Sequence, residues 1–534
     1  MKNTNQKHQT TILAITAMLI GAIFSAHRFS SSIIIPSIHT ILLSIFIFGS
    51  IGLTKSKGIA RLLLSTFYAL PLFFRIAYES DPSVGSLMSL YSTNTSEVTN
   101  FISENLAYLS LSIFTFFIIW IFPTNKINKN TLRAALLIGT AYILLGTIKD
   151  FISKSEDDIS ILELKYTAKG YSPLSSRALV ALDFAILRLP NLSLLVSISD
   201  TIKFHLSKST AKRDLWKNIG KISSPDKLLI LIIGESQRAD HLRLFGYPRN
   251  TTPHSQKLKE QLFSIKAVSG GTNTWTSLPS TLSFSDKSGQ VDISRNIIGL
   301  SKKAGYKTWW ISNQAHISNW DFGVSSIASQ SDYSFFSSKN GYKNIPPDSL
   351  ILPHFLKILK QAKRNNKPDL VVLHLYGSHP TFEDRYPDNF NLYNDGSTRS
   401  KYDNSILYTD SVLYRAIRII ERFNGEFIYF SDHGLIQESN PNIDFKHDVR
   451  NNPSIDSVIV PLISNKKLDL SDTVNLYFFE CIFSEWAGIE TDDINDNHCR
   501  DASGSDYGFF LDANLVLRKI KVSARVFKTG SFIG

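Results

Sequence analysis

The fold of this chain is decided by the stretch LLILIIGES at residues 228–236. Its first six residues are aliphatic, and the run then breaks into Gly234, Glu235 and Ser236. A continuous apolar run followed by turn residues is typical of a strand buried on both faces of a parallel sheet. Ligands of such sheets gather just beyond the carboxyl ends of the strands. Glu235 is therefore a candidate ligand of a metal or a substrate, although a strand-end glutamate beside a helix N-cap is equally common.

Further strands and a helix are predicted on the carboxyl side of this stretch. Residues 402–423 carry apolar side chains at helical spacing. Four more strand-like runs occur, at 307–312, 370–375, 426–430 and 457–463. This alternation of strands and helical segments predicts an α/β domain with a mostly parallel central sheet.

The chain has 534 residues, which is too long for one ordinary hydrophobic core, and its long apolar runs are concentrated in the first 150 residues. Each run approaches the roughly 20 residues that cross a bilayer. The loops between the runs alternate between basic and acidic, so the positive-inside rule predicts a cytoplasmic N-terminus and an external C-terminal part. The five predicted spans are residues 11–26, 32–53, 59–76, 106–122 and 132–148.

Composition then predicts three regions. Residues 1–150 form a five-helix transmembrane domain, 151–221 an interfacial amphipathic connector, and 222–534 the external domain. In the connector, residues 178–196 are apolar but are interrupted by charges and a proline, which favours a helix along the interface over a sixth span. The formal net charge of +11 comes without a nucleic-acid recognition motif, so we expect anionic lipid rather than nucleic acid as its partner.

The chain contains two cysteines, Cys481 and Cys499, and both lie in the external part. An oxidising compartment permits a disulfide between them. Two free, partly buried thiols are equally compatible with the sequence, so the pairing stays open.

Polar residues follow three of the predicted strands at the point where each strand ends. They are Glu235, His379, and the neighbouring Asp432 and His433. Because parallel strands bring their carboxyl ends to one edge of the sheet, these groups should meet, and carboxylate with imidazole suits zinc. His447 lies shortly downstream and could join them. A single histidine is more often an ordinary polar residue than a ligand, so the group as a whole supports the metal hypothesis.

A transfer centre also needs a nucleophile. Residues 269–276 form a small-residue loop rich in hydroxyls, and a metal can activate a hydroxyl without a neighbouring base. An ordinary turn that caps a helix explains the same composition. Composition alone does not choose among the hydroxyls of this loop.

Six motifs, taken in order, resemble the bacterial lipid A and lipooligosaccharide phosphoethanolamine transferases. They are GESQRADH at 234–241, GYPRNT at 246–251, GTNT at 271–274, HLYGSH at 374–379, YDNSILYTD at 402–410 and SDHG at 431–434. The resemblance covers nearly the whole chain and is strongest over residues 227–462. It implies five transmembrane helices in the bacterial inner membrane and a periplasmic, sulfatase-like domain of the alkaline-phosphatase type.

The resemblance also implies roles for particular residues. Thr274 would be the nucleophile that takes the phosphoethanolamine. The zinc ligands would be Glu235, Thr274, Asp432 and His433. His379 and His447 would match histidines that bind the substrate phosphate or a second zinc. In the sequence TNTSE, Thr93 and Glu97 would lie near the bound head group, although a helix capping box explains that stretch as well.

The implied activity is that of a zinc-dependent, monomeric transferase that moves phosphoethanolamine from phosphatidylethanolamine to lipopolysaccharide through a phosphothreonine. Where many family members have cysteines that flank the nucleophile loop, this chain has Gly270 and Ser280. Its sequence WWISNQ at 309–314 more nearly resembles the branch that modifies the core heptose, which favours a core sugar over lipid A as acceptor. The alternatives are a phosphoglycerol transferase of the teichoic-acid synthase type and a catalytically silent, metal-binding membrane scaffold.

Overall fold

The chain forms two compact units, Met1–Ile202 and Lys203–Gly534. A computed structural model describes the following residues: scattered positions between 69 and 148, then 172–187, 216–220, 227–315, 323–338, 345–362, 367–437, 445–448, 453–470 and 473–522.

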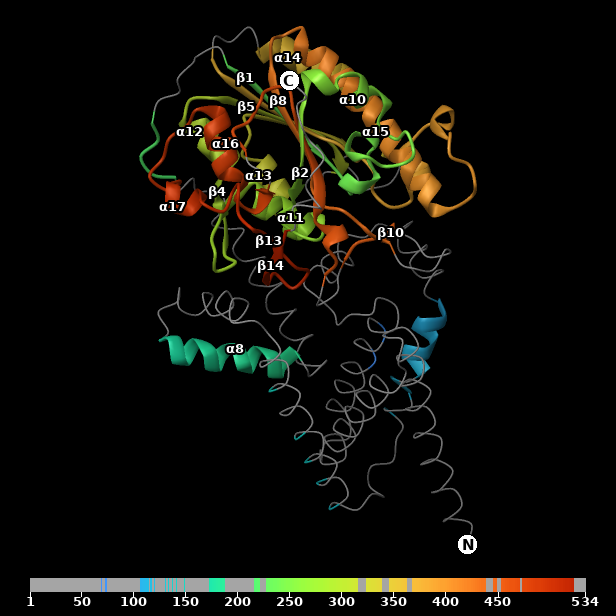
Figure 1. Cartoon of the computed structure of the whole chain (residues 1–534), viewed down its shortest axis with the longest axis vertical. Helices are drawn as coiled ribbons and strands as arrows, with labels where there is room; N and C mark the ends of the chain where they lie inside the picture. Colours follow the sequence, from blue (N-terminus) through green and yellow to red (C-terminus); the bar gives the residue numbers. More distant parts are fainter. Residues whose placement is uncertain are drawn as a thin grey trace. The chain divides into compact units, whose positions relative to one another are not determined.

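In the first unit the longest described helix is α8, Pro173–Leu187 (Figure 1). Pro173 occupies the first helical position, where its missing N–H costs nothing, and the Ser172 hydroxyl accepts a hydrogen bond from the Ser175 N–H at 3.3 Å. Among the described residues, no helix is both long and apolar enough to cross a bilayer. The predicted spans 11–26 and 32–53 lie outside the described residues, as do most residues of the spans 59–76 and 132–148. Most residues of the span 106–122 are described, and they are helical.

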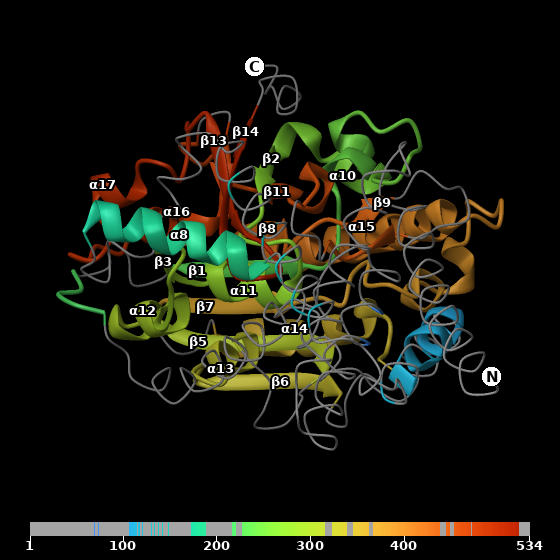
Figure 2. The ribbon, with the colours of Figure 1, turned by 90° about the horizontal axis from the view of Figure 1, so that it is seen from below.

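The second unit is built on an eight-stranded sheet (Figures 1 and 2). From edge to edge its strands are β12 (Val474–Asn475), β2 (Phe263–Val268), β11 (Ile459–Ser464), β8 (Glu426–Ser431), β1 (Leu228–Gly234), β7 (Asp369–His374), β5 (Lys307–Ala315) and β6 (Tyr333–Ser338). All five strands expected from the sequence are present, and the sheet is mostly parallel as predicted.

One strand of the second unit departs from the mostly parallel direction of the sheet. Strand β11 is antiparallel to both of its neighbours, β8 and β2. A parallel partner of β8 would need a crossover that carries the chain back to the other edge of the sheet. Between these two strands the described residues form only short pieces, among them β9 (Ile436–Gln437), β10 (Phe445–Lys446) and the 3-10 helix Ile455–Ser457. The chain therefore re-enters the sheet from the edge where β8 ended.

Both faces of the sheet are buried, as the aliphatic run of β1 predicts. Its residues Ile230 and Ile232 pack in one core with Phe355 of α14 (Leu352–Ala362) and Ile406 of α15 (Thr398–Glu421). Phe430 of β8 pairs with Ile233 of β1, which points to the other face. The Phe430 ring lies 5.1 Å from that of Phe479 in α16 (Phe479–Ala487). Helices therefore cover each side of the sheet (Figure 2).

The remaining elements complete the second unit. The helices are α10 (Pro253–Lys257), α11 (Thr274–Thr281), α12 (Ile297–Lys303), α13 (Val324–Ala328), α14 (Leu352–Ala362), α15 (Thr398–Glu421), α16 (Phe479–Ala487) and α17 (Asp496–Cys499). Two further hairpins pair β3 (Ser283–Ser285) with β4 (Val291–Asn296), and β13 (Tyr507–Leu511) with β14 (Leu517–Lys521). Helix α15 begins before the predicted residue 402 because the Ser397 hydroxyl caps it, accepting from the Ser400 N–H at 3.1 Å.

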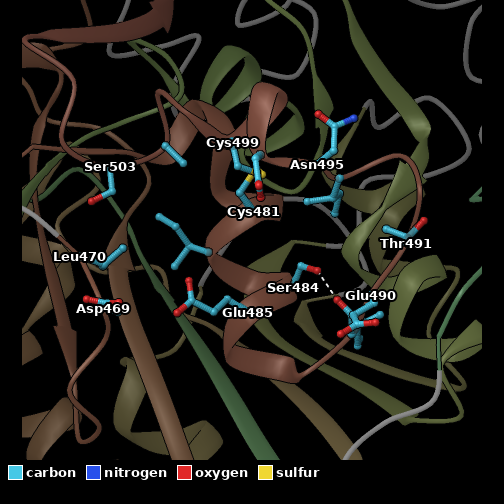
Figure 3. A pocket seen from close by; sticks show the side chains of 15 residues that line it. Asp469, Leu470, Cys481, Ser484, Glu485, Glu490, Thr491, Asn495, Cys499 and Ser503 are labelled. Atoms are coloured by element: carbon cyan, nitrogen blue, oxygen red, sulfur yellow. Dashed lines mark hydrogen bonds between the residues drawn. A yellow bond between two sulfur atoms is a disulfide. The ribbon is translucent and has the colours of Figure 1, made fainter.

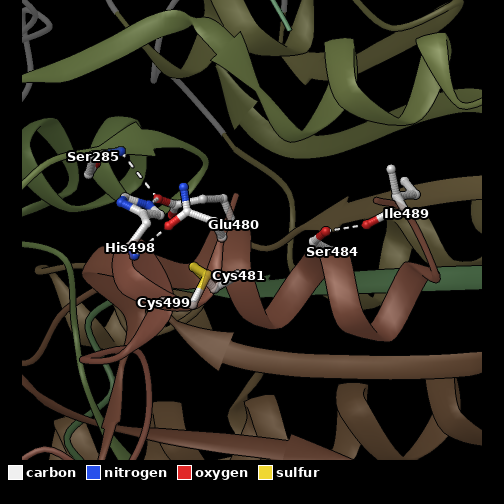
Figure 4. The surroundings of a disulfide bond; sticks show 8 residues. Ser285, Glu480, Cys481, Ser484, Ile489, His498 and Cys499 are labelled. Carbon is white, nitrogen blue, oxygen red and sulfur yellow. Dashed lines mark hydrogen bonds and ion pairs between the residues drawn. A yellow bond between two sulfur atoms is a disulfide. The ribbon is translucent and has the colours of Figure 1, made fainter. Parts of the chain in front are cut away.

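Cys481 of α16 and Cys499 of α17 form a disulfide (Figure 4). The bond answers the question that the sequence left open. It joins residues 18 positions apart, so it ties the short helix α17 to the longer α16.

We predict that reduction of this bond lowers the free energy of unfolding by about 3 kcal/mol, because the unfolded chain regains the entropy of an open loop. Thermal unfolding of the full chain with and without reductant measures the effect. A Cys481→Ser/Cys499→Ser variant is the control and should not respond to reductant, since the chain has no other cysteine. Equal stability of the oxidised and reduced parent would contradict the prediction.

Candidate active site

Glu235 is held by a tight turn at the carboxyl end of β1. It is fully buried, and the next residue, Ser236, adopts a left-handed conformation with φ of 59°. The Ser236 N–H donates to Asp432 Oδ1 at 2.9 Å, and its hydroxyl donates to Glu235 Oε1 at 2.7 Å. The turn after β1 is therefore tied directly to the turn after β8.

Thr274 is the first residue of α11, and Asn273 caps the helix by accepting from the Thr276 N–H at 3.1 Å. The loop before it is fixed by strand β13. The Thr272 N–H donates to the carbonyl of Leu511 at 3.2 Å. A segment near the C-terminus thus sets the position of the hydroxyl-rich loop.

The Thr274 hydroxyl points into the group of strand-end residues. Its Oγ1 lies 2.8 Å from Asp432 Oδ2 and 3.2 Å from His433 Nε2. The two carboxylate oxygens of Glu235 lie 3.3 and 3.4 Å away. The four residues that the sequence suggested as metal ligands therefore meet around one oxygen atom, although they come from three separate segments.

The orientation of two of these side chains is fixed by the backbone. His433 Nδ1 lies 2.7 Å from the carbonyl of Gly434, to which it donates as an N–H, so Nε2 is the ring nitrogen that faces the centre. Asp432 Oδ1 accepts from the Ser236 N–H and, at 2.8 Å, from the His433 N–H. Its other oxygen, Oδ2, is the one that faces Thr274.

The electrostatics of the group fit a bound cation. Burial raises the pKa of Asp432 to about 8, and the nearby Glu235 charge adds to this. Burial opposes a charge on His433, but the Asp432 and Glu235 carboxylates outweigh it and raise its pKa to about 9. Burial also opposes ionisation of Glu235, yet the hydrogen bond and charge of His433 hold its pKa below the usual range. Two buried carboxylates this close repel each other, and a divalent metal would relieve the repulsion.

The structure brings His447 to the same place. The ligand atoms of Glu235, His433 and His447 all lie within 4.8 Å of one another, so these three could also share a metal ion. The His447 ring is 5.8 Å from that of His379, which stacks on Tyr376 at 5.0 Å. Burial and the neighbouring imidazoles lower the pKa of His447 to about 3. Thr93 and Glu97 lie outside the described residues.

The sequence motifs do not predict that Gln314 and Asp348 contact the residues of the centre or the turn beside it. Gln314 Nε2 lies 3.5 Å from Glu235 Oε2 and donates to the carbonyl of Leu375 at 3.0 Å. Asp348 is buried and accepts from the N–H groups of Tyr376 and Gly377, each at 2.8 Å. Gln314 belongs to the WWISNQ stretch, which bears on the identity of the acceptor, but that motif does not predict its contact with Glu235. Asp348 belongs to none of the six motifs, and its role is visible only from its burial and hydrogen bonds in the folded structure.

The positions where related proteins were expected to carry cysteines lie side by side. The Ser280 hydroxyl donates to the Gly270 carbonyl at 3.0 Å and lies 2.8 Å from the carbonyl of Thr276. A side chain at 270 would collide with this hydroxyl. In this chain hydrogen bonds of the Ser280 hydroxyl therefore connect the two positions that a disulfide would join in many related proteins.

Gly377 offers a test of how tightly the centre is held. It has φ of 47°, and a Cβ there would lie 2.9 Å from both the N and the O of Glu235. We predict that Gly377→Ala displaces Glu235 and weakens divalent-metal affinity at least about tenfold, measured by competition titration.

Gly305→Ala is the matched control. Gly305 has φ of 94° with no atom within 4 Å of its Cβ position, so it carries the left-handed strain without the collision. The metal affinity of the Gly305→Ala variant should equal that of the parent. Equal losses in both variants, or no loss in either, would contradict the prediction.

Comparison with known proteins places this geometry in context. Residues 227–465 match the family model described as Sulfatase. A Haemophilus influenzae relative is 32% identical over 298 residues, which cover 52% of this chain and 60% of that protein. The phosphoethanolamine transferase OpgE of Escherichia coli is 28% identical over 299 residues, covering 54% of this chain and 56% of OpgE. The chain therefore spans little more than half the length of these curated relatives.

A solved structure extends the likeness to most of the chain. The integral membrane lipooligosaccharide phosphoethanolamine transferase A of Neisseria meningitidis aligns with a TM-score of 0.58 at 18% identity, over 85% of this chain and 87% of that one. At this identity the match establishes a shared fold. The sequence matches confirm the resemblance drawn from the motifs: residues 227–465 form a sulfatase-type domain, and the chain is similar in sequence to phosphoethanolamine transferases.

Proposed function

We propose that this protein transfers phosphoethanolamine from phosphatidylethanolamine to lipopolysaccharide through a covalent phosphothreonine on Thr274. The main support for this proposal is the position of the Thr274 hydroxyl, which lies within 3.4 Å of every other residue of the proposed zinc site. We assign as zinc ligands Glu235, Thr274, Asp432 and His433.

The donor set supports zinc as the metal. Carboxylate and imidazole ligands suit this ion, and a hydroxyl in the fourth position leaves the site reactive rather than closed. When bound, zinc polarises a phosphoryl oxygen and lowers the pKa of the hydroxyl next to it. A silent scaffold would have no need of a half-buried hydroxyl in that position.

The reaction that we propose has two displacements. In the first, Thr274 Oγ1 forms a bond to phosphorus while the bond from phosphorus to the diacylglycerol oxygen breaks. The threonine proton has its nearest acceptor in Asp432 Oδ2, at 2.8 Å. In the second, an oxygen of the acceptor hydroxyl or phosphate forms a bond to phosphorus, the bond from phosphorus to Thr274 Oγ1 breaks, and Oγ1 regains a proton.

The surroundings of Thr274 favour an anionic phosphoryl group. Thr274 begins α11, and the N-terminal end of a helix attracts negative charge. The His447 ring lies 5.0 Å from that of His433, and the His379 ring lies 5.8 Å from that of His447. We assign these two further imidazoles to the substrate phosphate.

We also propose that the N-terminal unit holds the protein in the inner membrane, with residues 222–534 in the periplasm. In the predicted fourth span, four large apolar side chains expose half or more of their surface, as expected of a helix that contacts lipid. They are Leu106, Ile113, Phe114 and Phe117. Spans would keep the site at the depth of the donor head group, which Thr93 and Glu97 are proposed to contact.

We predict that Thr274→Ala abolishes transfer, because it removes the atom that carries the phosphoryl group. Thr274→Ser should retain part of the activity, since a hydroxyl remains and chiefly its positioning changes. Intact-mass measurement after incubation with phosphatidylethanolamine should find a phosphoethanolamine adduct on the parent, mapped by fragmentation to Thr274.

Thr272→Ala is the control in the same loop. The Thr272 hydroxyl contacts the Asn273 amide at 3.5 Å and none of the site carboxylates, so this variant should transfer far better than Thr274→Ala. Full transfer by Thr274→Ala, or an adduct on Thr272, would overturn the assignment.

The acceptor is tested by mass spectrometry of lipid A and core oligosaccharide from cells with and without the protein. We expect a phosphoethanolamine-sized gain on the core sugar ahead of lipid A, because the stretch 309–314 more nearly resembles the branch that modifies the core heptose. This stretch lies in β5 and ends in Gln314, beside Glu235. A phosphoglycerol-sized gain would favour the teichoic-acid synthase type of reaction instead.

A further inference from the structure

A second group of potential metal ligands surrounds the disulfide. The ligand atoms of Glu480, Cys481 and His498 all lie within 4.8 Å of one another, and Cys481 is bonded to Cys499. None of these residues belongs to the catalytic centre described above. While the disulfide is intact its sulfur atoms are poor ligands, because a thiolate is the form of cysteine that binds metals.

The four side chains come from two helices that the disulfide joins. Glu480 and Cys481 are consecutive in α16, and His498 and Cys499 are consecutive in the short helix α17. The Asn495 side chain caps α17 by accepting from the His498 N–H at 3.1 Å. Two adjacent pairs on facing elements thus present their side chains to one another (Figure 4).

Glu480 is the unusual member of the group. It is fully buried, and its Oε1 accepts from His498 Nε2 at 2.7 Å and from the Ser285 N–H at 3.3 Å. Its Oε2 is buried and has no hydrogen-bond partner among the described residues. A buried carboxylate oxygen without a partner is costly, and coordination to a metal is one way to satisfy it.

His498 is held in a fixed orientation beside that carboxylate. Its ring stacks on Phe284, with 4.4 Å between centroids and 13° between planes. Phe478 packs against the same ring edge-on at 5.6 Å. The two aromatic rings keep Nε2 directed at Glu480, so the imidazole needs little rearrangement to bind an ion there.

A pocket gives access to the disulfide from one side. It has a volume of about 340 Å³, and both cysteines are among its fifteen lining residues (Figure 3). Its lining contains no lysine, arginine or histidine but four acidic residues, Asp469, Glu485, Glu490 and Asp496. A pocket with this charge concentrates cations near the sulfur atoms.

We propose that reduction of the Cys481–Cys499 bond creates a zinc-type metal site. A dithiol, or a phosphine together with one water molecule, supplies two electrons and two protons, and the sulfur–sulfur bond breaks. The dithiol is oxidised to a disulfide, or the phosphine takes the water oxygen and becomes a phosphine oxide. Two thiols result, and they release their two protons when the metal binds. The ligands are the two thiolates, Nε2 of His498 and the carboxylate of Glu480, a set that suits tetrahedral zinc.

The disulfide and the metal therefore exclude each other. In the oxidised chain a covalent bond ties α17 to α16, and in the reduced chain a metal ion would tie the same four side chains together. Metal binding to the folded chain then offsets part of the stability that is lost on reduction. The protein would in this way respond to the redox state and the metal supply of its compartment together.

Cobalt(II) is the probe that isolates this site. The full chain is reduced with a phosphine, the phosphine is removed without air, and cobalt(II) is titrated in. The chain has no other cysteine, and the catalytic centre contains no sulfur, so absorption from thiolate-to-cobalt charge transfer reports on this site alone. We expect that absorption, with one further equivalent of cobalt, in the reduced chain but not in the oxidised chain.

Variants test the two ligands that are not cysteines. Glu480→Gln and His498→Gln should each weaken cobalt affinity at this site at least about tenfold. Glu485→Gln is the matched control, since Glu485 lies on the same helix, lines the pocket and is exposed. It should leave the affinity unchanged, because the site requires ligands and not merely an acidic pocket.

Two results would overturn the proposal. One is a reduced, folded chain that shows no charge-transfer absorption with cobalt. The other is an affinity that Glu480→Gln and His498→Gln leave equal to that of the parent. If reduction unfolds α16 and α17, excess cobalt should restore the circular dichroism of the oxidised chain, and failure to do so would also count against the site. None of these readouts depends on transferase activity.

Discussion

The parallel pairing of β1 with β8 is the constraint on which the proposed active site depends. In their register Ile233 lies opposite Phe430 and Gly234 opposite Ser431, so both strands end side by side. Glu235 and Asp432 then leave the sheet at one point, and the Ser236 N–H reaches across to the Asp432 carboxylate at 2.9 Å. A slip of one residue would turn the side chains of one strand to opposite faces and separate the two carboxylates.

That arrangement places two carboxylates that repel each other side by side. Glu235 and Asp432 are both buried. Burial, with the nearby Glu235 charge as a second cause, raises the pKa of Asp432 to about 8, so protons or a cation must balance the charge. The turns around them are accordingly well anchored. The Tyr402 hydroxyl donates to the Ser236 carbonyl at 2.7 Å and accepts from the Arg238 N–H at 2.9 Å. Anchoring of this kind keeps the ligands in place whether or not a metal is bound.

The nucleophile helix is connected to the disulfide region through a short hairpin strand. Ser285 of β3 donates its hydroxyl to the carbonyl of Ser280 in α11 at 2.8 Å, and its N–H donates to Glu480 of α16. The packing that positions Thr274 therefore rests partly on the helix that carries Cys481. The two metal sites that we propose are separate in their ligands but share this layer of helices above the sheet.

The buried strands, the polar residues at their ends and the family resemblance all follow from the amino-acid sequence, because they depend on local composition and on ordered motifs. The segments that carry Glu235, Thr274 and Asp432 are for this reason recognisable from their residues alone. The reversed direction of β11 and the pairing of Cys481 with Cys499 were decided only by tertiary packing. So were the contact of Gln314 with Glu235 and the anchoring role of Asp348. Each of these depends on which distant segment packs against which, and local hydrophobic periodicity carries no information about such long-range partners.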